Sequence, residues 1–480
     1  MRTITSTVAA AALSLASFAA ASRAEAATTR KVGPGAPYAK PCDAIAAAQP
    51  DDVIEIAAGT YTDSCTIGVK GLTLRGVGGR PKIDLSGTDQ PAQLKGIYVV
   101  DADDVRIENL ELTGAHISDG NGGNAAGIRV FGNNLVVHGC YIHDSQNGIL
   151  GENKTPGSTL TVENTELARN ALGDGCNQGG CTHNIYVNFG KLLFQYNWSH
   201  EVANDTADKG HLFKSRSKQS ILLYNRFTGE TGINSYELNF PNGGLVVLVG
   251  NVVQKSAKSG NPVMVAYGEE GLSNPDLRVF AASNTFVSGR PGGTFFNLQG
   301  ATSLVAHDNI FVGGGALSST GQLPADNLSG VDPLFVSPST YDYRLKSGSP
   351  AADRGVAPGS ADAFSLVPTR EYLQPVTSVP RKDDGKLDLG AFEIGTDLSP
   401  ADAGVDGGGD AAPAGPSGKP GGANAPDAAA ASGAPEDGAA SGDSAAGCSA
   451  ATGGGARSAG AALLALSAVL AVRGRRRRTS

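Results

Sequence analysis

The sequence has few of the residues that build helical cores and nucleic-acid interfaces. It contains 1 Trp and 2 Met among 480 residues, and aromatic residues make up only 6% of the chain. Its 38 Lys and Arg are outnumbered by 46 Asp and Glu, which gives a net charge of −8. Such a chain lacks the basic stripe and stacking platforms of a nucleic-acid-binding protein. The 66 Gly and 25 Pro instead favour turn-rich β-structure.

The two ends of the chain have the composition of export and linker segments. Residues 1–26 combine a basic start at Arg2, an apolar run and the pattern Ala24-Glu25-Ala26, which predicts a secretory signal peptide. Residues 396–446 are almost entirely Ala, Gly, Pro, Ser and Asp, a composition that predicts a disordered spacer. We therefore expect an exported protein whose folded domain spans 27–395.

A short tail follows the spacer at 447–480. It has Cys448 among small residues, an apolar stretch at 459–472 and an arginine cluster at 475–478. The stretch is shorter than the roughly 20 residues of a membrane span. The tail resembles the sorting tails of myxobacterial surface proteins. This resemblance implies processing near Cys448 and attachment to the cell surface or outer membrane, or release from it, and a plain membrane anchor is the alternative.

Short apolar strands recur along the central region, and an asparagine follows each of them. The series comprises Asn109, Asn164, Asn197, Asn225, Asn251, Asn284 and Asn309, with Gly139 in the equivalent place of one further coil. From Asn164 onward the separations are 33, 28, 26, 33 and 25 residues, which is typical of solenoid repeats. We predict an all-β, right-handed parallel β-helix. Its asparagines should stack in a column of left-handed turn residues.

Both ends of this solenoid have recognisable segments. Residues 42–48 predict a short amphipathic helix that caps the first coil, and 332–335, 342–345, 349–353 and 387–393 follow the last one. Together they resemble the entry and exit segments of extracellular β-helix proteins of the pectate-lyase-like superfamily. The resemblance implies the fold and activity on polysaccharide. The lyases of that superfamily use Lys or Arg bases, with calcium or positive side chains at the sugar carboxylate.

The cysteines agree with export. We expect disulfides between Cys42 and Cys65 and between Cys176 and Cys181, because oxidising compartments favour them. Cys140 would remain a buried free thiol. No Cys or His pairs occur at zinc-finger spacings, so the cysteines imply no metal.

Polar residues alternate with apolar ones in three consecutive coils, which predicts a polar patch on one outer face. Aligning the coils on their asparagines turns Ile185, Phe213 and Tyr236 inward. The predicted outward set is Tyr186, Asn188, Lys214, Arg216, Glu237 and Asn239. An ordinary solvated face, with Lys214 paired to Glu237, is an equal alternative.

Three further side chains belong to this candidate site. Tyr267, on the following coil, is expected to extend the patch as a stacking platform for a sugar. His183 and His211 share the inward parity and are candidates for contact with the substrate. Hydrogen bonding of these two rings to turn backbone is an equal alternative.

A Lys and an Arg in one patch favour β-elimination from a uronate-containing polysaccharide. Arg216 would clamp the sugar carboxylate and favour the neutral amine of Lys214 as the base. His211 or Tyr186 would serve as the acid or as an alternate base. Asn188, Glu237 and Asn239, with their oxygen atoms, would orient the sugar or hold a calcium ion.

Two other functions remain open. A glycoside hydrolase needs two carboxylates about 5 to 9.5 Å apart. The patch supplies Glu237, with Glu152, Asp174 and Asp205 as candidate partners, so we rank this reaction below a lyase. A non-catalytic module that binds glycans or mediates adhesion is the alternative from a different class. The expected partner is a polysaccharide in each case, and no oligomer is implied.

Overall fold

The computed structural model describes residues 27–88, 90–172, 182–203, 210–300, 303–321 and 323–398. The predicted signal peptide, Cys176, Cys181, most of the spacer and the tail with Cys448 lie outside these residues, as do Asp174 and Asp205. Within the described ranges, no helix has the length and apolar character that a membrane span requires.

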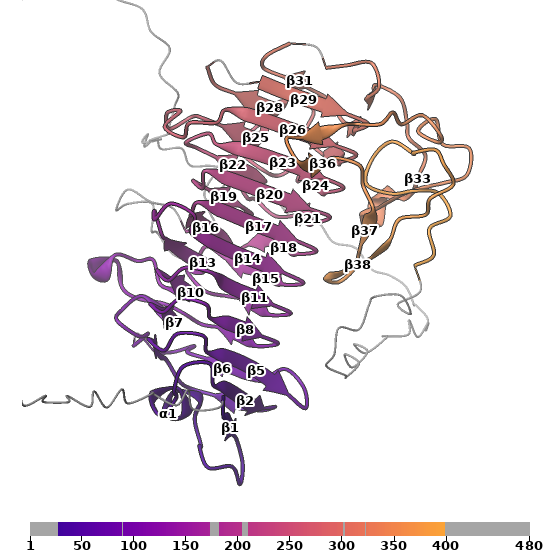
Figure 1. Ribbon diagram of the computed structural model, residues 1–480. Coiled ribbons are helices and arrows are strands. Elements are labelled where there is room, and N and C mark those ends of the chain that lie inside the picture. Colours follow the sequence, from indigo (N-terminus) through magenta and orange to yellow (C-terminus); the bar gives the residue numbers. More distant parts are fainter. Residues whose placement is uncertain are drawn as a thin grey trace, which may run out of the picture. The chain divides into compact units, whose positions relative to one another are not determined.

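Three parallel sheets, called here A, B and C, form the walls of a β-helix (Figure 1). Most coils contribute one strand to sheet A, then one to sheet B, then one to sheet C, so strands paired within a sheet lie one coil apart in the sequence. This topology confirms the all-β parallel β-helix that the repeats predicted.

Sheets A and B each contain eleven strands of the described chain. In spatial order, sheet A consists of β1 (Thr29–Val32), β2 (Val53–Ala57), β5 (Thr73–Val77), β8 (Arg106–Glu108), β11 (Leu135–His138), β14 (Thr159–Glu163), β17 (Lys191–Gln195), β20 (Gln219–Leu223), β23 (Leu245–Val249), β26 (Arg278–Ala282) and β29 (Ser303–His307). Sheet B consists of β3 (Thr60–Tyr61), β6 (Lys82–Asp84), β9 (Glu111–Thr113), β12 (Tyr141–His143), β15 (Glu166–Asn170), β18 (Trp198–Val202), β21 (Arg226–Thr228), β24 (Val252–Lys255), β27 (Thr285–Ser288), β30 (Ile310–Val312) and β32 (Leu328–Ser329).

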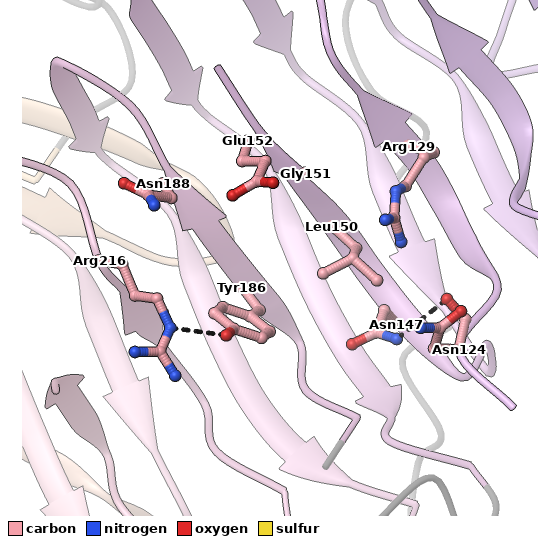
Figure 2. A pocket seen from close by; sticks show the side chains of 9 residues that line it. All are labelled: Asn124, Arg129, Asn147, Leu150, Gly151, Glu152, Tyr186, Asn188 and Arg216. Carbon is pink, nitrogen blue, oxygen red and sulfur yellow. Dashed lines mark hydrogen bonds between the residues drawn. The ribbon is translucent and has the colours of Figure 1, made fainter. Parts of the chain in front are cut away.

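Sheet C contains ten strands of the described chain and carries the pocket drawn in Figure 2. In spatial order it consists of β4 (Cys65–Ile67), β7 (Gly96–Val100), β10 (Ala126–Val130), β13 (Asn147–Glu152), β16 (Ile185–Asn188), β19 (Lys214–Ser215), β22 (Leu238–Phe240), β25 (Val263–Tyr267), β28 (Thr294–Leu298) and β31 (Ala316–Ser318).

The described chain also has short helices and hairpins outside the three sheets. The helices are α1 (Pro41–Ala46) and the 3-10 turns η1 (Asp119–Asn121) and η3 (Pro338–Thr340). The hairpins pair β33 (Phe335–Ser337) with β34 (Asp342–Leu345), β35 (Ser360–Ala361) with β36 (Phe364–Ser365), and β37 (Arg370–Leu373) with β38 (Thr377–Pro380). Helix α1 lies where the sequence predicted a helix, and it buries Ala44 and Ile45 in the main core.

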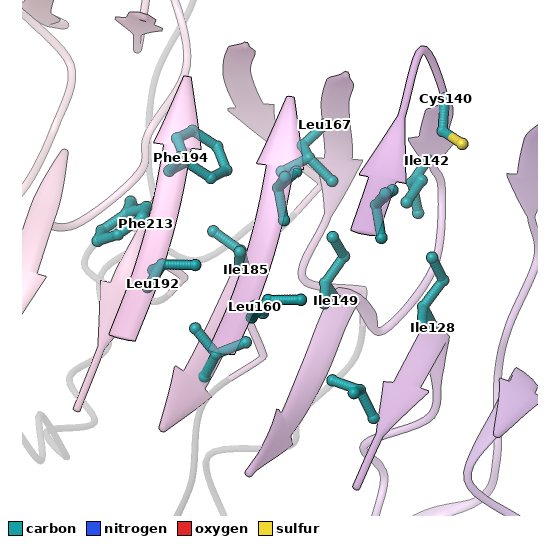
Figure 3. Packing of buried hydrophobic residues seen from close by; sticks show 14 of the residues in the cluster. Ile128, Cys140, Ile142, Ile149, Leu160, Leu167, Ile185, Leu192, Phe194 and Phe213 are labelled. Carbon is teal, nitrogen blue, oxygen red and sulfur yellow. The ribbon is translucent and has the colours of Figure 1, made fainter. Parts of the chain in front are cut away.

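The core is built from apolar side chains stacked from coil to coil (Figure 3). On sheet C, Ile128, Ile149 and Ile185 occupy equivalent positions in neighbouring strands. On sheet A, Leu160 lies directly opposite Leu192. All five are fully buried. Each such side chain contributes roughly 1.5 to 3 kcal/mol through the apolar area it removes from water.

The asparagine column exists, but its first members differ from the prediction. It runs from Asn197 through Asn225, Asn251, Asn284 and Asn309 to Asn327, and each side-chain Oδ1 accepts the backbone N–H of the preceding member. Thr165 precedes Asn197 in this chain of bonds, so Asn164 lies one position before the column. The left-handed residues at these turns are Asn109, Gly139 and Asn164 and, in later coils, the residue before each column asparagine from Asn197 to Asn309, such as Tyr196 and Tyr224.

The two cysteines of the first coils form the predicted disulfide. Cys42 and Cys65 are bonded, with their Cα atoms 5.8 Å apart. Cys140 is a buried free thiol, as predicted, and burial raises its pKa to about 11.

The segment after the last coil packs on the outside of sheets A and B (Figure 1). Val252 and Ile310 on the outer face of sheet B contact Phe335 and Tyr343, which belong to this segment. The outer face of sheet A is covered in the same way by the β35–β36 hairpin. Sheet A is therefore apolar on both faces in the later coils, where β23 is buried throughout, and the outer face of sheet B is covered at Val252 and Ile310.

Candidate functional site

A pocket of about 250 Å³ lies on the outer face of sheet C, with its lining side chains drawn in Figure 2. They come from strands β10, β13 and β16, from the residue after β19 and from the loop before β10. The lining residues are Asn124, Arg129, Asn147, Leu150, Gly151, Glu152, Tyr186, Asn188 and Arg216.

The parallel register arranges these side chains in two rows across the strands. The first row holds Arg129, Leu150, Tyr186, Lys214 and Asn239 at equivalent positions of five neighbouring strands. The second row lies two residues further along and starts with Glu152 and Asn188. Residues two apart on a strand point to the same side, so both rows face outward.

The predicted outward residues Tyr186, Asn188, Lys214 and Arg216 do lie together at this surface. Arg216 donates from Nε to the hydroxyl of Tyr186 at 2.6 Å, and the Lys214 ammonium lies 5.0 Å from the centre of the Tyr186 ring. Asn188 and Arg216 both line the pocket. The alternation of polar and apolar residues was thus a correct guide in the coils that contain β16 and β19.

Lys214 and Arg216 both pair with a carboxylate that the sequence did not predict at this site. Lys214 Nζ donates to Glu270 Oε1 at 2.9 Å, and Arg216 Nη2 donates to Glu270 Oε2. Burial alone would raise the pKa of Glu270, but the hydrogen bonds from the two cations hold it below its usual range. Arg216 also donates to Asn242, so each of its three guanidinium nitrogens has a hydrogen-bond partner. The expected pairing of Lys214 with Glu237 does not occur.

The two histidines are buried and hydrogen-bond to turn backbone, as the alternative interpretation held. His183 Nδ1 accepts the backbone N–H of His211, and His211 Nδ1 accepts the backbone N–H of Tyr236. The rings stack with their centres 4.4 Å apart. Burial lowers the pKa of both well below its usual value, so both are neutral at neutral pH. His183 is fully buried and thus cannot touch a substrate, whereas His211 is 8% exposed.

Three other predicted site residues are buried rather than presented to solvent. Tyr267 is fully buried and donates to the carbonyl of Gly244, so its prediction as a stacking platform is wrong. Glu237 is fully buried in an ion pair with Lys255 at 2.9 Å, and desolvation raises its pKa. Asn239 does follow Lys214 in the first row, but it is covered and donates to Glu269.

The error at Glu237 has a geometric cause, whereas Tyr267 is turned inward because it lies opposite the buried Phe240. The sequence alignment placed Glu237 beside Lys214 and turned Tyr236 inward beside Phe213. In the structure Lys214 pairs with Asn239, so Leu238 takes the inward place and Glu237 lies before the strand. The true register is thus shifted by two residues from the predicted one. Because the shift is even, outward positions stay outward, but Asn239 takes the place that was predicted for Glu237.

The proposed calcium ligands do not form a calcium site. Glu237 is held by Lys255, Asn239 is covered, and Asn188 lies in the other row. Within the described residues, no cluster of three or more His, Cys, Asp or Glu side chains could hold a metal ion. We therefore assign no step to calcium.

Comparison with known proteins supports the fold. No protein-family model matches the chain, and no match is found among curated proteins. The crystal structure of pectate lyase Pel9A is similar, with 18% identity, a TM-score of 0.54 and coverage of 77% of this chain and 97% of that one. A rhamnogalacturonan lyase matches with 11% identity, a TM-score of 0.45 and coverage of 65% and 91%. An alginate lyase from Paenibacillus sp. str. FPU-7 matches with 15% identity, a TM-score of 0.39 and coverage of 63% and 99%. The likeness to Pel9A agrees with a parallel β-helix and, at this identity, shows the fold alone.

Proposed function

We propose that this protein is a polysaccharide lyase that cleaves a uronate-containing glycan by β-elimination at Lys214 and Arg216. One observation supports this most directly: a single carboxylate, that of Glu270, is held by both cations at once. A uronate presents the same group, and its carboxylate must be neutralised before the adjacent carbon can lose a proton. The likeness to a pectate lyase supports the same class of substrate.

In the proposed reaction the sugar carboxylate replaces Glu270 on Arg216. The guanidinium offers a two-pronged donor that suits a carboxylate, and it withdraws charge from the adjacent carbon. Lys214, no longer paired with Glu270, then serves as the base. Its side chain is only 11% exposed, which protects the amine from bulk water.

The bonds change in a balanced way. The Lys214 amine takes the proton from the carbon beside the carboxylate, and the electron pair forms the carbon–carbon double bond. The neighbouring glycosidic carbon–oxygen bond breaks, and the leaving oxygen takes a proton from Tyr186. The Tyr186 hydroxyl already accepts a hydrogen bond from Arg216, which holds the hydroxyl in place at the pocket. His211, neutral and close to the surface, is the alternate acid.

The test follows ultraviolet absorbance of unsaturated sugars released from polygalacturonate, alginate, a glycosaminoglycan and a neutral glycan, with and without chelator. Wild-type protein should produce them from an acidic polymer, and Lys214→Ala should lower the rate at least a hundredfold because the base is lost. Lys218→Ala, an exposed lysine four residues away, is the matched control and should keep the wild-type rate. Absence of product on every polymer would refute the lyase, and retained binding would then favour a glycan-binding module.

The proposal includes export and surface display. The Cys42–Cys65 disulfide supports an oxidising compartment. The signal peptide at 1–26, the spacer and the tail processed near Cys448 stay predictions, as does the capping role of α1. Detection of the full chain in surface, membrane, cytoplasmic and medium fractions tests them, and a purely cytoplasmic protein would contradict them.

A further inference from the structure

Arg129 occupies the end of the pocket opposite Arg216, and the sequence analysis did not single it out (Figure 2). Its neighbours on β10, Ile128 and Val130, are fully buried in the core, so Arg129 itself points outward. It is the first member of the row that continues through Leu150 and Tyr186 to Lys214. The same sheet face therefore carries cations at both ends of one pocket.

The Arg129 guanidinium lacks the partners that Arg216 has. Its Nε and Nη1 atoms are buried and have no hydrogen-bond partner among the described residues. Its Cζ atom lies 5.2 Å from the centre of the Phe131 ring, a contact that leaves the N–H groups free. Glu152, the carboxylate of the same pocket, is paired with Lys154 at 3.0 Å instead. Desolvation lowers the pKa of Arg129, and the charge of nearby Glu152 offsets this only in part.

A partly buried cation whose N–H groups lack acceptors is costly to the folded protein. The cost is recovered when a ligand carboxylate supplies the missing acceptors, and an arginine fork binds such a group through two parallel hydrogen bonds. Asn124, which is partly exposed, also lines the pocket and can supply a further hydrogen bond to a sugar hydroxyl, whereas the buried Asn147 side chain already bonds to Asn124 and His183 (Figure 2).

The spacing sets where this carboxylate lies on the substrate. Three strand spacings separate β10 from β19, which is about 14 Å at roughly 4.8 Å per strand. That span exceeds a single sugar ring. Between the two cations, Leu150 and the Tyr186 ring offer apolar surface for the faces of intervening sugars.

We propose that Arg129 binds a second carboxylate of the same glycan chain, more than one sugar away from the residue held at Arg216. The substrate is then a polymer with repeated acidic sugars, laid across the strands of sheet C. This inference rests on the proposed function, which places the reaction at the Arg216 end of the pocket. It adds that the substrate must also carry a negative charge at the Arg129 end.

The test measures retardation of the full-length protein in gels that contain polygalacturonate or its methyl ester, which lacks the carboxylate charge. Arg129→Gln should weaken binding to polygalacturonate about ten- to a hundredfold and leave binding to the ester unchanged. Arg129→Lys keeps the charge but loses the two-pronged donor. Its affinity for polygalacturonate should therefore lie between those of the wild type and Arg129→Gln. Arg75→Ala is the matched control, because this arginine lies on sheet A and its partner Glu108 keeps Arg106.

The outcomes separate the two proposals. If Arg129→Gln keeps its thermal midpoint and binds polygalacturonate like the wild type, the second carboxylate site is refuted, whether or not the protein cleaves the polymer. If Arg129→Gln weakens binding while the wild type forms no unsaturated product, the carboxylate site at Arg129 is supported and the lyase activity is refuted. Equal losses on polygalacturonate and its ester would also refute a carboxylate site. Wild-type protein that binds no polygalacturonate at all would overturn it directly.

Discussion

At the scale of single residues, the two cations of the candidate site already hold a carboxylate of the protein in place of the proposed ligand. Glu270 reaches Lys214 and Arg216 from the loop after β25, two coils beyond β19. Alternation within strands was enough to find Lys214 and Arg216, because both lie in or next to a regular strand. It could not find Glu270, since the path of a loop is not encoded by strand periodicity. Arg129 was missed because it lies two coils before the aligned ones.

Glu270→Gln should therefore strengthen binding of an acidic glycan. The substitution removes a negative charge that competes with the ligand for two cations, while the amide keeps an acceptor for one of them. Because Glu270 is partly exposed, we expect a gain of only several-fold, which should shrink as salt is raised. Gel retardation in polygalacturonate at two salt concentrations measures it.

Glu269→Gln is the control for that experiment. It makes the same change in charge one residue away, at a carboxylate that contacts Asn239 instead of the cations. A gain at Glu269 equal to that at Glu270 would show a general effect of charge. Weaker binding by Glu270→Gln would contradict competition and indicate that Glu270 itself holds the ligand.

At the scale of elements, each turn from sheet A to sheet B uses two adjacent residues. One adopts the left-handed conformation, and the next forms the hydrogen bonds between coils. The first residue takes the left-handed conformation, as in Asn164, Tyr196 and Tyr224. The second carries the side chain that bonds from coil to coil, as in Thr165 and Asn197. The regular spacing of asparagines predicted the column from Asn197 onward. It misplaced Asn164 because asparagine suits both the left-handed position and the hydrogen-bonding position, and only the hydrogen bonds of the structure distinguish the two.

Asn251→Ala should destabilise the fold strongly. Asn251 Oδ1 accepts from the backbone N–H and the side-chain amide of Asn225, and Asn251 Nδ2 donates to the carbonyl of Leu222. All these groups are buried, and each one left without a partner costs roughly 1 to 3 kcal/mol. We expect the free energy of unfolding to fall by about 3 kcal/mol in urea denaturation. Asn121→Ala, on an exposed turn, should change it little, and equal effects would argue against the column as a source of stability.

At the scale of the β-helix domain, the segment that follows the last coil covers sheets A and B, while the pocket lies on sheet C. Composition and strand patterns predicted the β-helix and the presence of end segments. They could not show where the end segment docks, because its contacts are separated by long stretches of sequence. The backbone N–H of Thr369, for example, donates to Tyr224 Oη at 3.0 Å, although the two residues lie 145 positions apart in the sequence. Asp308 likewise accepts the N–H of Val356, and burial raises its pKa to about 6.

Docking of this segment should make stability depend on pH through Glu371. Glu371 is 1% exposed on β37, and its Oε1 atom accepts from the backbone N–H of Glu393 and the hydroxyl of Thr396. Burial raises its pKa from 4.5 to about 7. In the window between these values the folded state keeps a proton that the unfolded state releases, so the contribution of Glu371 to stability falls as pH rises, by about 3 kcal/mol in total.

Glu371→Gln removes this dependence and keeps an oxygen acceptor for both hydrogen bonds. Relative to wild type, the variant should gain stability between pH about 4.5 and about 7 and hold that gain above it, because only the wild type must then bury a charge. Urea unfolding of both proteins at either end of this window measures the difference. Glu55→Gln, on the partly exposed β2, serves as the matched control and should show no such change. A difference between Glu371→Gln and wild type that stays constant across the window would show that Glu371 ionises alike in the folded and unfolded chains.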